Sequence, residues 1–376
     1  MLRVIHAVKA GGDLLGVEVA LGELAVAQHH IGLDVHLLVN GEWPEGKVRA
    51  HGIPVHQVAS RDLVRSVRTL ATPDTVVHSH TLWSTITMLP LLLGASRPAM
   101  ALSPHGSLAA EALRSKRLKK RLAWATLLRR AVRMHEGLVV TSPAERCDVE
   151  HLLPGQRIEL LPNAIVAPPG LGDVLPSKSQ TVGYVGRLHP IKGTLELIEA
   201  WRRVSALAHG WRLRIVGPVE DAAYYGRLRA LADPDPTISL EGPLYGPDKW
   251  RMLAECELVV VPSRSENFGN VVAEAFLMGT PVVATLGVPW PEIEEEGIGW
   301  RGPGDADGLA AMLRSAMSAS SVDRAERGSR GRALVDARYN HELIARRSIG
   351  IYERLRDYSK AIRRTDSSGV DQADAS

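Results

Sequence analysis

The chain has 376 residues, of which 45% are hydrophobic and 5% aromatic, as in a globular protein with two domains or one large domain. Its 45 Lys and Arg nearly balance 42 Asp and Glu, giving a net charge of +3, which argues against a polybasic nucleic-acid-binding protein. The two distant cysteines, Cys147 and Cys256, argue against a disulfide framework, and no apolar run is long enough to span a bilayer, so we expect a cytoplasmic protein.

The first half of the chain alternates short apolar runs with helical patterns. Helices are predicted at 17–30 and, rich in Lys and Arg, at 111–134. Such alternation is typical of parallel strands joined by crossover helices. The predicted strands lie at 2–8, 34–39, 76–80, 100–103, 137–141 and 158–161.

The second half repeats this pattern after a segment rich in Pro, Gly and Ser at 162–180, which reads as a linker. Its predicted strands lie at 181–185, 212–216, 237–240, 258–262 and 282–284, with helices between them. The fold class is therefore α/β, with two doubly wound, Rossmann-like domains. The predicted divisions are domains at 1–165 and 181–340, a helix at 341–362 and a disordered tail at 363–376.

The stretch at 263–285, SRSENFGNVVAEAFLMGTPVVAT, reads as a loop, a helix and a strand. The helix start at Glu266–Asn270 offers backbone N–H groups to an anion such as a phosphate. Glu274 stands among apolar residues, where an unpaired carboxylate is costly. It either pairs with a core Arg or accepts hydrogen bonds from ligand hydroxyl groups, as Glu266 would from the loop.

The stretch at 183–193, GYVGRLHPIKG, begins on a predicted strand and ends where a helix begins. Arg187 and Lys192 bracket the turn, so with the helix start they can clamp a pyrophosphate. The alternative is two solvated loop charges.

These motifs resemble the retaining glycosyltransferases of the type-B fold, family 4. The resemblance rests on Glu266 and Glu274, with seven residues between them, within SENFGNVVAEAFLMGTPVV, and on GRLHPIKG. It implies two domains facing a cleft, a final helix that crosses back to the first domain, and Arg187 and Lys192 on the phosphates of a nucleoside diphosphate sugar. It also implies that His105, in SPHGSL just past a strand end, faces the donor sugar.

Gly11 and Gly12 follow the first strand but do not form a G-x-G-x-x-G fingerprint, which argues against a dinucleotide dehydrogenase. The resemblance implies that this loop approaches the donor phosphates or the acceptor. The roles of Asp13 and Glu18 stay open. The predicted catalytic residues are His105, Arg187, Lys192 and Glu266. The predicted donor-binding residues are Gly11, Gly12, Arg187, Lys192, Glu266, Asn267, Phe268, Gly269, Asn270, Val271 and Glu274.

No metal or cofactor is predicted. The acidic triplets Asp233–Asp235 and Asp305–Asp307 could suggest a metal-dependent transferase, but they stand beside Pro or Gly and read as turns.

The expected function is retaining, metal-independent transfer of a hexose from a UDP- or GDP-sugar to a glycan or lipid-linked acceptor. The phrases Gly287–Trp290 and Gly297–Trp300 look like the family members that build bacterial surface polysaccharides, such as exopolysaccharide or lipopolysaccharide. The basic segment 111–133, with Leu118, Leu122, Ala125, Leu128 and Val132 on one expected packed face, suggests peripheral contact with the inner face of an anionic cell membrane. The alternatives are a nucleotide-sugar epimerase of the same fold and a catalytically silent sugar-binding subunit.

Overall fold

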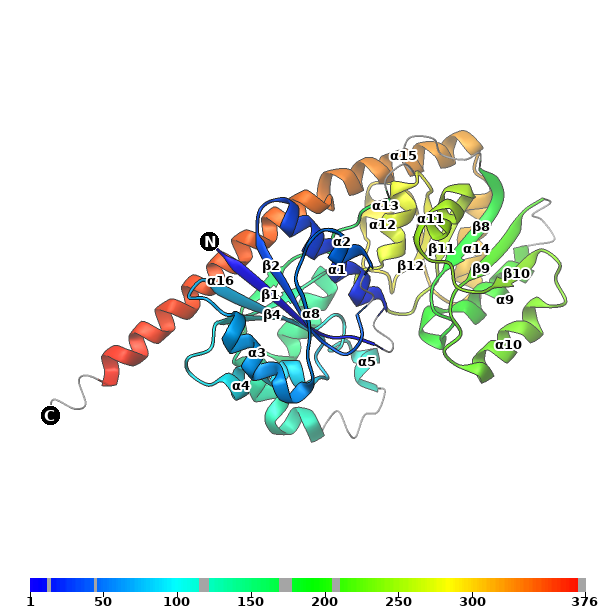
Figure 1. Cartoon of the computed structure of the whole chain (residues 1–376). Helices are drawn as coiled ribbons and strands as arrows, with labels where there is room; N and C mark the ends of the chain where they lie inside the picture. The colour runs from blue at the N-terminus through cyan, green and yellow to red at the C-terminus, as the bar shows by residue number, and fades with distance from the viewer. Residues whose placement is uncertain (12–14, 44–45, 115–121, 169–177, 205–209, 371–376) are drawn as a thin grey trace. The chain divides into compact units, whose positions relative to one another are not determined.

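The computed structural model describes residues 1–376 except 12–14, 44–45, 115–121, 169–177, 205–209 and 371–376 (Figure 1). The chain forms two compact units. Unit 1 comprises Met1–Ala164 and His341–Ser376, and unit 2 comprises Ile165–Asn340. Within the described residues, no helix combines the length and the apolar character needed to cross a membrane.

Unit 1 contains a parallel sheet of seven strands in the order β3-β2-β1-β4-β5-β6-β7. The chain begins on the inner strand β1, adds β2 and β3 on one side, and then crosses to the other side. The switch point therefore lies between β1 and β4, where α/β sheets present ligand sites. The strands are β1 Arg3–Lys9, β2 Asp34–Asn40, β3 Val55–Gln57, β4 Thr75–His80, β5 Ala99–Ser103, β6 Gly137–Val140 and β7 Ile158–Leu160.

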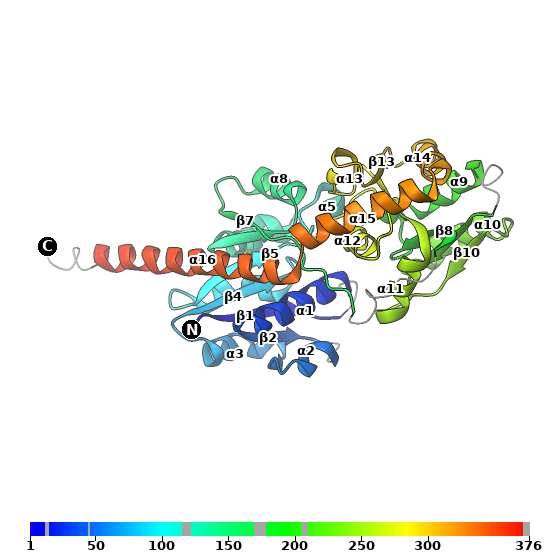
Figure 2. The same ribbon diagram turned by 90° about the horizontal axis from the view of Figure 1, so that it is seen from above.

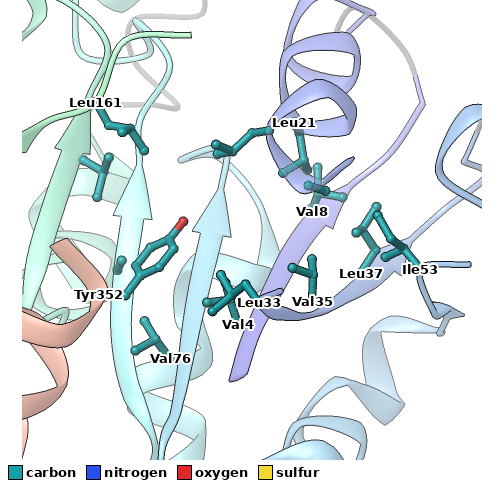
Figure 3. Packing of buried hydrophobic residues seen from close by; sticks show 14 of the residues in the cluster. Val4, Val8, Leu21, Leu33, Val35, Leu37, Ile53, Val76, Leu161 and Tyr352 are labelled. Carbon is teal, nitrogen blue, oxygen red and sulfur yellow. The ribbon is translucent and has the colours of Figure 1, made fainter. Parts of the chain in front are cut away.

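Helices cover both faces of this sheet (Figure 2). Side chains alternate along β1, so Val4 and Val8 face one layer of helices while Ile5 and Ala7 face the other. Figure 3 shows the first of these cores, to which the last helix of the chain contributes Tyr352. One face carries α1 Leu15–His30, α2 Gly46–Ala50 and α16 His341–Val370. The other carries α3 Leu63–Leu70, α4 Leu89–Leu93, α7 Arg129–Arg133 and α8 Pro143–Leu152.

Unit 2 contains a parallel sheet of six strands in the order β10-β9-β8-β11-β12-β13, with its switch point between β8 and β11. The strands are β8 Ser179–Val185, β9 Arg212–Val216, β10 Ile238–Glu241, β11 Cys256–Val261, β12 Val282–Thr285 and β13 Gly299–Gly302. Helices α9 Thr194–Val204, α10 Ala222–Ala232 and α14 Ala306–Ser318 cover one face. Helices α11 Gly246–Glu255, α12 Asn270–Leu277 and α15 Ser321–Arg338 cover the other, and α13 Glu292–Glu295 is a single turn. The α/β class with two Rossmann-like parallel sheets is confirmed.

The prediction of one regular amphipathic helix over residues 111–134 is wrong. After α5 Ala110–Arg114, the described chain resumes at Leu122 in a helical conformation, and a π-helical turn follows at Trp124–Leu128, where Thr126 has the non-helical angles φ −98 and ψ −120. Leu122 and Ala125 are exposed and do not belong to a packed face, and the π-helical turn does not keep the regular spacing of about 3.6 residues that the prediction assumed. Leu128 and Val132 are buried as predicted, and Leu118 lies outside the described residues.

The prediction of disorder from residue 363 onward is also wrong for part of that segment, because α16 continues to Val370. Its polar composition hid a 30-residue helix whose first half packs on β5 and α1. Sequence patterns also missed the short strands β3 and β13, whose few residues carry no clear alternation.

Candidate functional site

Two loops meet at the switch point of unit 2, at the carboxyl ends of the adjacent strands β8 and β11. The Arg264 N–H donates to the Ile191 carbonyl at 2.9 Å and ties the loops together. Gly193 has φ +68, and a Cβ there would lie 2.0 Å from the Pro262 carbonyl oxygen. Only glycine permits this approach, so the sequence GRLHPIKG builds a close-packed edge where parallel sheets bind ligands.

Lys192 and Glu266 form an ion pair between these two loops. Lys192 Nζ donates to Glu266 Oε1 at 2.6 Å, and Ser263 Oγ donates to the same oxygen at 2.7 Å. Arg187 instead binds Glu220, with Nη1 donating to both carboxylate oxygens at 2.8 and 3.0 Å. Glu220 was not identified from the sequence. Each predicted phosphate-binding cation thus has a carboxylate partner that an incoming diphosphate would replace or share.

Glu274 on α12 is 5% exposed, and its two oxygens have different surroundings. Oε1 accepts from Lys249 Nζ on α11 at 2.6 Å, whereas the buried Oε2 has no hydrogen-bond partner among the described residues. A buried carboxylate oxygen without a donor is costly, which suits an oxygen that receives a ligand hydroxyl.

Glu274 does form a salt bridge, one of its two predicted roles, but the predicted partner, an Arg, is wrong, because the partner is a Lys. Lys249 lies 25 residues before Glu274 on a separate helix. No motif surrounds it, and we see no signal in the sequence that would have identified it.

The segment before α12 is anchored from its apolar side. The Phe268 ring is buried against Trp290 and Tyr339, and the Phe268 carbonyl accepts from Trp290 Nε1 at 2.6 Å. Gly269 has φ +82 and precedes the first helical residue, Asn270. The side chain of Phe268 therefore belongs to the core and holds the helix start in place, while Asn267, Asn270 and Val271 are half-buried around that positive end.

In unit 1, the loop that carries His105 is held in an unusual backbone conformation. His105 has φ 50, uncommon for a residue with a side chain, and Gly106 follows with φ 72. The Gly106 N–H donates to Glu145 Oε1 at 2.6 Å, and the Thr141 N–H donates to Oε2 at 2.8 Å. Burial lowers the pKa of His105 to about 4, so the ring is neutral near pH 7.

Gly11 lies two residues after β1 of unit 1, and its N–H donates to Glu18 Oε1 at 2.8 Å. Glu18 is buried, so this acid, whose role the sequence left open, holds the loop after β1. Gly12 and Asp13 lie outside the described residues. Gly11 and His105 belong to unit 1, whereas the Lys192, Glu266 and Glu274 group belongs to unit 2.

The acidic triplets have local roles. Asp235 accepts from the N–H and the hydroxyl of Thr237 at 2.9 and 2.6 Å, and Asp305 accepts from the Gly308 N–H at the start of α14. Asp235 thus makes a turn, as the sequence predicted, whereas Asp305 caps a helix, which the sequence analysis did not predict. A different group, His6, His78 and His80, has ring nitrogens within 4.8 Å of one another in unit 1.

Comparison with known proteins matches both halves of the chain to family models. Residues 16–164 match the glycosyl transferase 4-like domain, and residues 179–319 match glycosyl transferases group 1. A D-inositol 3-phosphate glycosyltransferase of Mycolicibacterium vanbaalenii is 31% identical over 209 residues, 46% of each chain. A GDP-mannose-dependent monoacylated alpha-(1-6)-phosphatidylinositol monomannoside mannosyltransferase of Corynebacterium glutamicum is 31% identical over 44% of this chain and 45% of its own length. The matches thus span less than half the length of these relatives.

Solved structures resemble the whole chain at lower identity. HepE of Anabaena, in complex with UDP and glucose, aligns with a TM-score of 0.73 at 20% identity and covers 94% of this chain and 100% of its own. WaaG, a glycosyltransferase involved in lipopolysaccharide biosynthesis, aligns with a TM-score of 0.69 at 16% identity and covers 92% of this chain and 98% of its own. At this identity the likeness establishes the fold.

Proposed function

The chain belongs to the group 1, family 4-like glycosyltransferases of the type-B fold, and from that premise we propose that it transfers a hexose from a UDP- or GDP-sugar to an acceptor hydroxyl. Unit 2 binds the donor nucleotide in this proposal. The observation that carries it is the buried Oε2 of Glu274, which has no hydrogen-bond partner in the described part of the chain and lies on the helix that follows the switch-point loops. A carboxylate oxygen in that position suits the ribose hydroxyls of a nucleotide.

The other residues at this edge suit the diphosphate and the sugar. Lys192, Arg187 and the positive end of α12 stabilise the diphosphate, and Glu266 accepts hydrogen bonds from the donor sugar. As the reaction proceeds, the acceptor oxygen bonds to the anomeric carbon and the diphosphate leaves with the electron pair of the broken bond. The acceptor proton passes to a donor phosphate oxygen on the same face, so the configuration is retained. The cations meet the developing negative charge, so the proposal needs no metal or other cofactor.

The test measures binding before chemistry. Calorimetric titration with UDP and with GDP should give saturable binding to one of them, weakened by Lys192→Ala. Incubation with UDP-glucose and with GDP-mannose, in the presence of candidate acceptors, should then release UDP or GDP together with a glycosylated product. A new sugar nucleotide formed without an acceptor would establish an epimerase instead, and failure to bind either nucleotide would refute the proposal.

The acceptor in this proposal is a glycan, lipid-linked or free, of the cell envelope. The name of the relative from Corynebacterium supports a lipid-linked acceptor, because it specifies a monoacylated phosphatidylinositol monomannoside. Peripheral membrane contact is part of the same proposal. Arg129 and Arg130 at the start of α7 are exposed and can face anionic lipid, while the cations at 115–121 lie outside the described residues.

Sedimentation with vesicles tests the membrane contact. The chain should bind anionic vesicles at low salt, and an Arg129→Glu/Arg130→Glu variant should bind them less while keeping its nucleotide affinity. Equal partition to neutral and anionic vesicles would contradict an electrostatic contact.

A further inference from the structure

Three buried histidines lie together on the face of the unit 1 sheet that α1 and α16 cover. Val4 and Val8 of β1 and Val76 of β4 lie on this face (Figure 3). Because side chains alternate along a strand, His6 on β1 shares the face with Val4 and Val8, and His78 and His80 on β4 share it with Val76. The parallel register places His6 directly beside His78. All three histidines are at most 2% exposed.

A chain of hydrogen bonds runs from Gln28 on α1 through two of these rings to His105. Gln28 Oε1 lies 2.7 Å from His6 Nε2, and His6 Nδ1 lies 2.9 Å from His80 Nε2. His80 Nδ1 in turn lies 2.9 Å from His105 Nε2. Burial lowers the pKa of His6 and of His105 to about 4 and holds that of His80 well below its usual value, so all three rings are neutral near pH 7. Each neutral ring has one donor and one acceptor nitrogen, so the direction of one bond sets the direction of all.

Gln28 sets that direction. The Ser348 hydroxyl donates to the Ala345 carbonyl at 2.6 Å, so its oxygen is left to accept from Gln28 Nε2 at 2.8 Å. The Gln28 carbonyl oxygen therefore faces His6, and it can only accept. His6 must then donate from Nε2 and accept at Nδ1, and the same order passes through His80 to His105.

A second branch requires the same orientation of the Gln28 amide. The Ser103 hydroxyl donates to the Val139 carbonyl at 2.9 Å, so Ser103 Oγ accepts from His78 Nε2 at 2.8 Å. His78 Nδ1 then accepts from the Tyr352 hydroxyl at 2.9 Å, and that hydroxyl accepts from Gln28 Nε2 at 3.3 Å. Both branches end on backbone carbonyls, which cannot donate, so a reversed network would lose hydrogen bonds at its ends.

We propose that Gln28, His6 and His80 are positioning residues that hold His105 in the tautomer protonated on Nε2, so that its Nδ1 lone pair accepts a hydrogen bond from a hydroxyl of the sugar substrate. Among the described residues, nothing donates to Nδ1 of His105. The sugar contact rests on the proposed glycosyltransferase function, whereas the tautomer rests on the hydrogen bonds of unit 1 alone.

A bound metal ion is the rival explanation for this cluster, because imidazole is a common metal ligand. All six ring nitrogens of His6, His78 and His80 already have hydrogen-bond partners. A metal would have to displace several of these hydrogen bonds and coordinate the freed ring nitrogens. The two explanations therefore predict different resonance frequencies for these nitrogens.

Nuclear magnetic resonance of protein labelled with ¹⁵N at histidine tests the tautomer directly, since protonated and unprotonated ring nitrogens have well-separated ¹⁵N frequencies. His105→Asn identifies the His105 signals by their loss. The wild-type protein should show His105 protonated on Nε2 between pH 6 and 8, and protonation on Nδ1 would overturn the proposal. Titration with Zn²⁺ should leave the spectrum unchanged, and stoichiometric binding that shifts the His6 and His80 signals would favour the metal site.

Variants separate the positioning role from simple support of the fold. Gln28→Met removes the acceptor and should give His105 a mixture of both tautomers. Tyr352→Phe breaks only the His78 branch and should leave His105 unchanged, as should Gln156→Met, which removes an amide that binds the His135 carbonyl elsewhere in unit 1. In transfer assays Gln28→Met should lower kcat/KM for the sugar donor about tenfold with unchanged affinity for free UDP or GDP. If the His105 tautomer is confirmed but no sugar transfer occurs, the proposed glycosyltransferase function is wrong and the positioning role of Gln28, His6 and His80 stands. If His105 keeps a single tautomer in Gln28→Met, that positioning role is wrong.

Discussion

Replacing Glu274 by Gln separates a ligand-binding carboxylate from one that serves only its salt bridge. The amide keeps the shape of the side chain and can still accept from Lys249, but it loses the charge. If Oε2 receives ribose hydroxyls, losing charge-assisted hydrogen bonds should weaken UDP or GDP binding by about 1–3 kcal/mol, or about 5- to 150-fold in Kd.

Glu274→Gln should also lower the stability of the fold, and a double-mutant cycle with Lys249 separates this effect from the loss of nucleotide binding. The pair is largely buried, with side chains 6% exposed for Glu274 and 19% for Lys249. Removing one partner of a buried pair costs about 3–5 kcal/mol, and because the amide still accepts a hydrogen bond we expect the lower end or less for Glu274→Gln. Lys249→Met should also destabilise, whereas Lys249→Met/Glu274→Gln removes both charges and should be more stable than the sum of the single effects predicts.

Urea unfolding and calorimetric nucleotide titration on the four proteins of the cycle measure these effects. Glu257→Gln is the matched control, because Glu257 pairs with the buried Arg324 in the same unit. It should lower stability and leave nucleotide affinity unchanged. If Glu274→Gln binds nucleotide as tightly as the wild type, or the double variant regains full affinity, Glu274 serves only the salt bridge and the reasoning is refuted.

Three further predictions concern the cations, the loop contact and pH. Lys192→Ala should reduce the single-turnover rate of sugar transfer more than the affinity for the donor. The wild-type protein should keep its activity in EDTA, and a strict requirement for added Mg²⁺ or Mn²⁺ would contradict metal-independent transfer. Gly193→Ala should lower the free energy of unfolding by at least about 1 kcal/mol and weaken nucleotide binding, because the new Cβ lies on a left-handed residue and meets the Pro262 carbonyl oxygen. The control Gly226→Ala, on α10, should be neutral or stabilising. Burial lowers the pKa of His6 and of His135 to about 4 from 6.5. Between pH 4 and pH 6.5, these two histidines therefore bind protons in the unfolded chain but not in the folded chain. Unfolding free energy measured in urea should therefore fall on acidification from pH 6.5 toward 4, by about 1.4 kcal/mol per pH unit for each histidine, and equal stability at pH 7 and pH 5 would show that these rings are not held neutral.

Local patterns identified most of the parallel strands because apolar, β-branched runs flanked by turn residues form strands in many contexts. The prediction for β9 matches its bounds, and those for β2, β8 and β12 differ by one or two residues. The basic segment after His105 shows the limit of this reasoning. Apolar residues at helical spacing predict a packed face only if the backbone stays regular, and in this segment the backbone is irregular at Trp124–Leu128 and Leu122 is exposed.

For the candidate site, the sequence by itself determined which residues lie at the ends of β8 and β11. A strand, a glycine-rich turn and a helix start each depend on residues that are adjacent in the sequence. The tertiary structure decided what those residues contact. Lys249 meets Glu274 because two helices pack against one face of a sheet, and Gln28, His6 and His80 reach His105 because parallel register and strand alternation place them on one face. These contacts join residues 22 to 74 positions apart whose neighbours carry no shared pattern. Buried polar groups must find partners wherever the fold brings them together, and that location exists only after the sheets have formed.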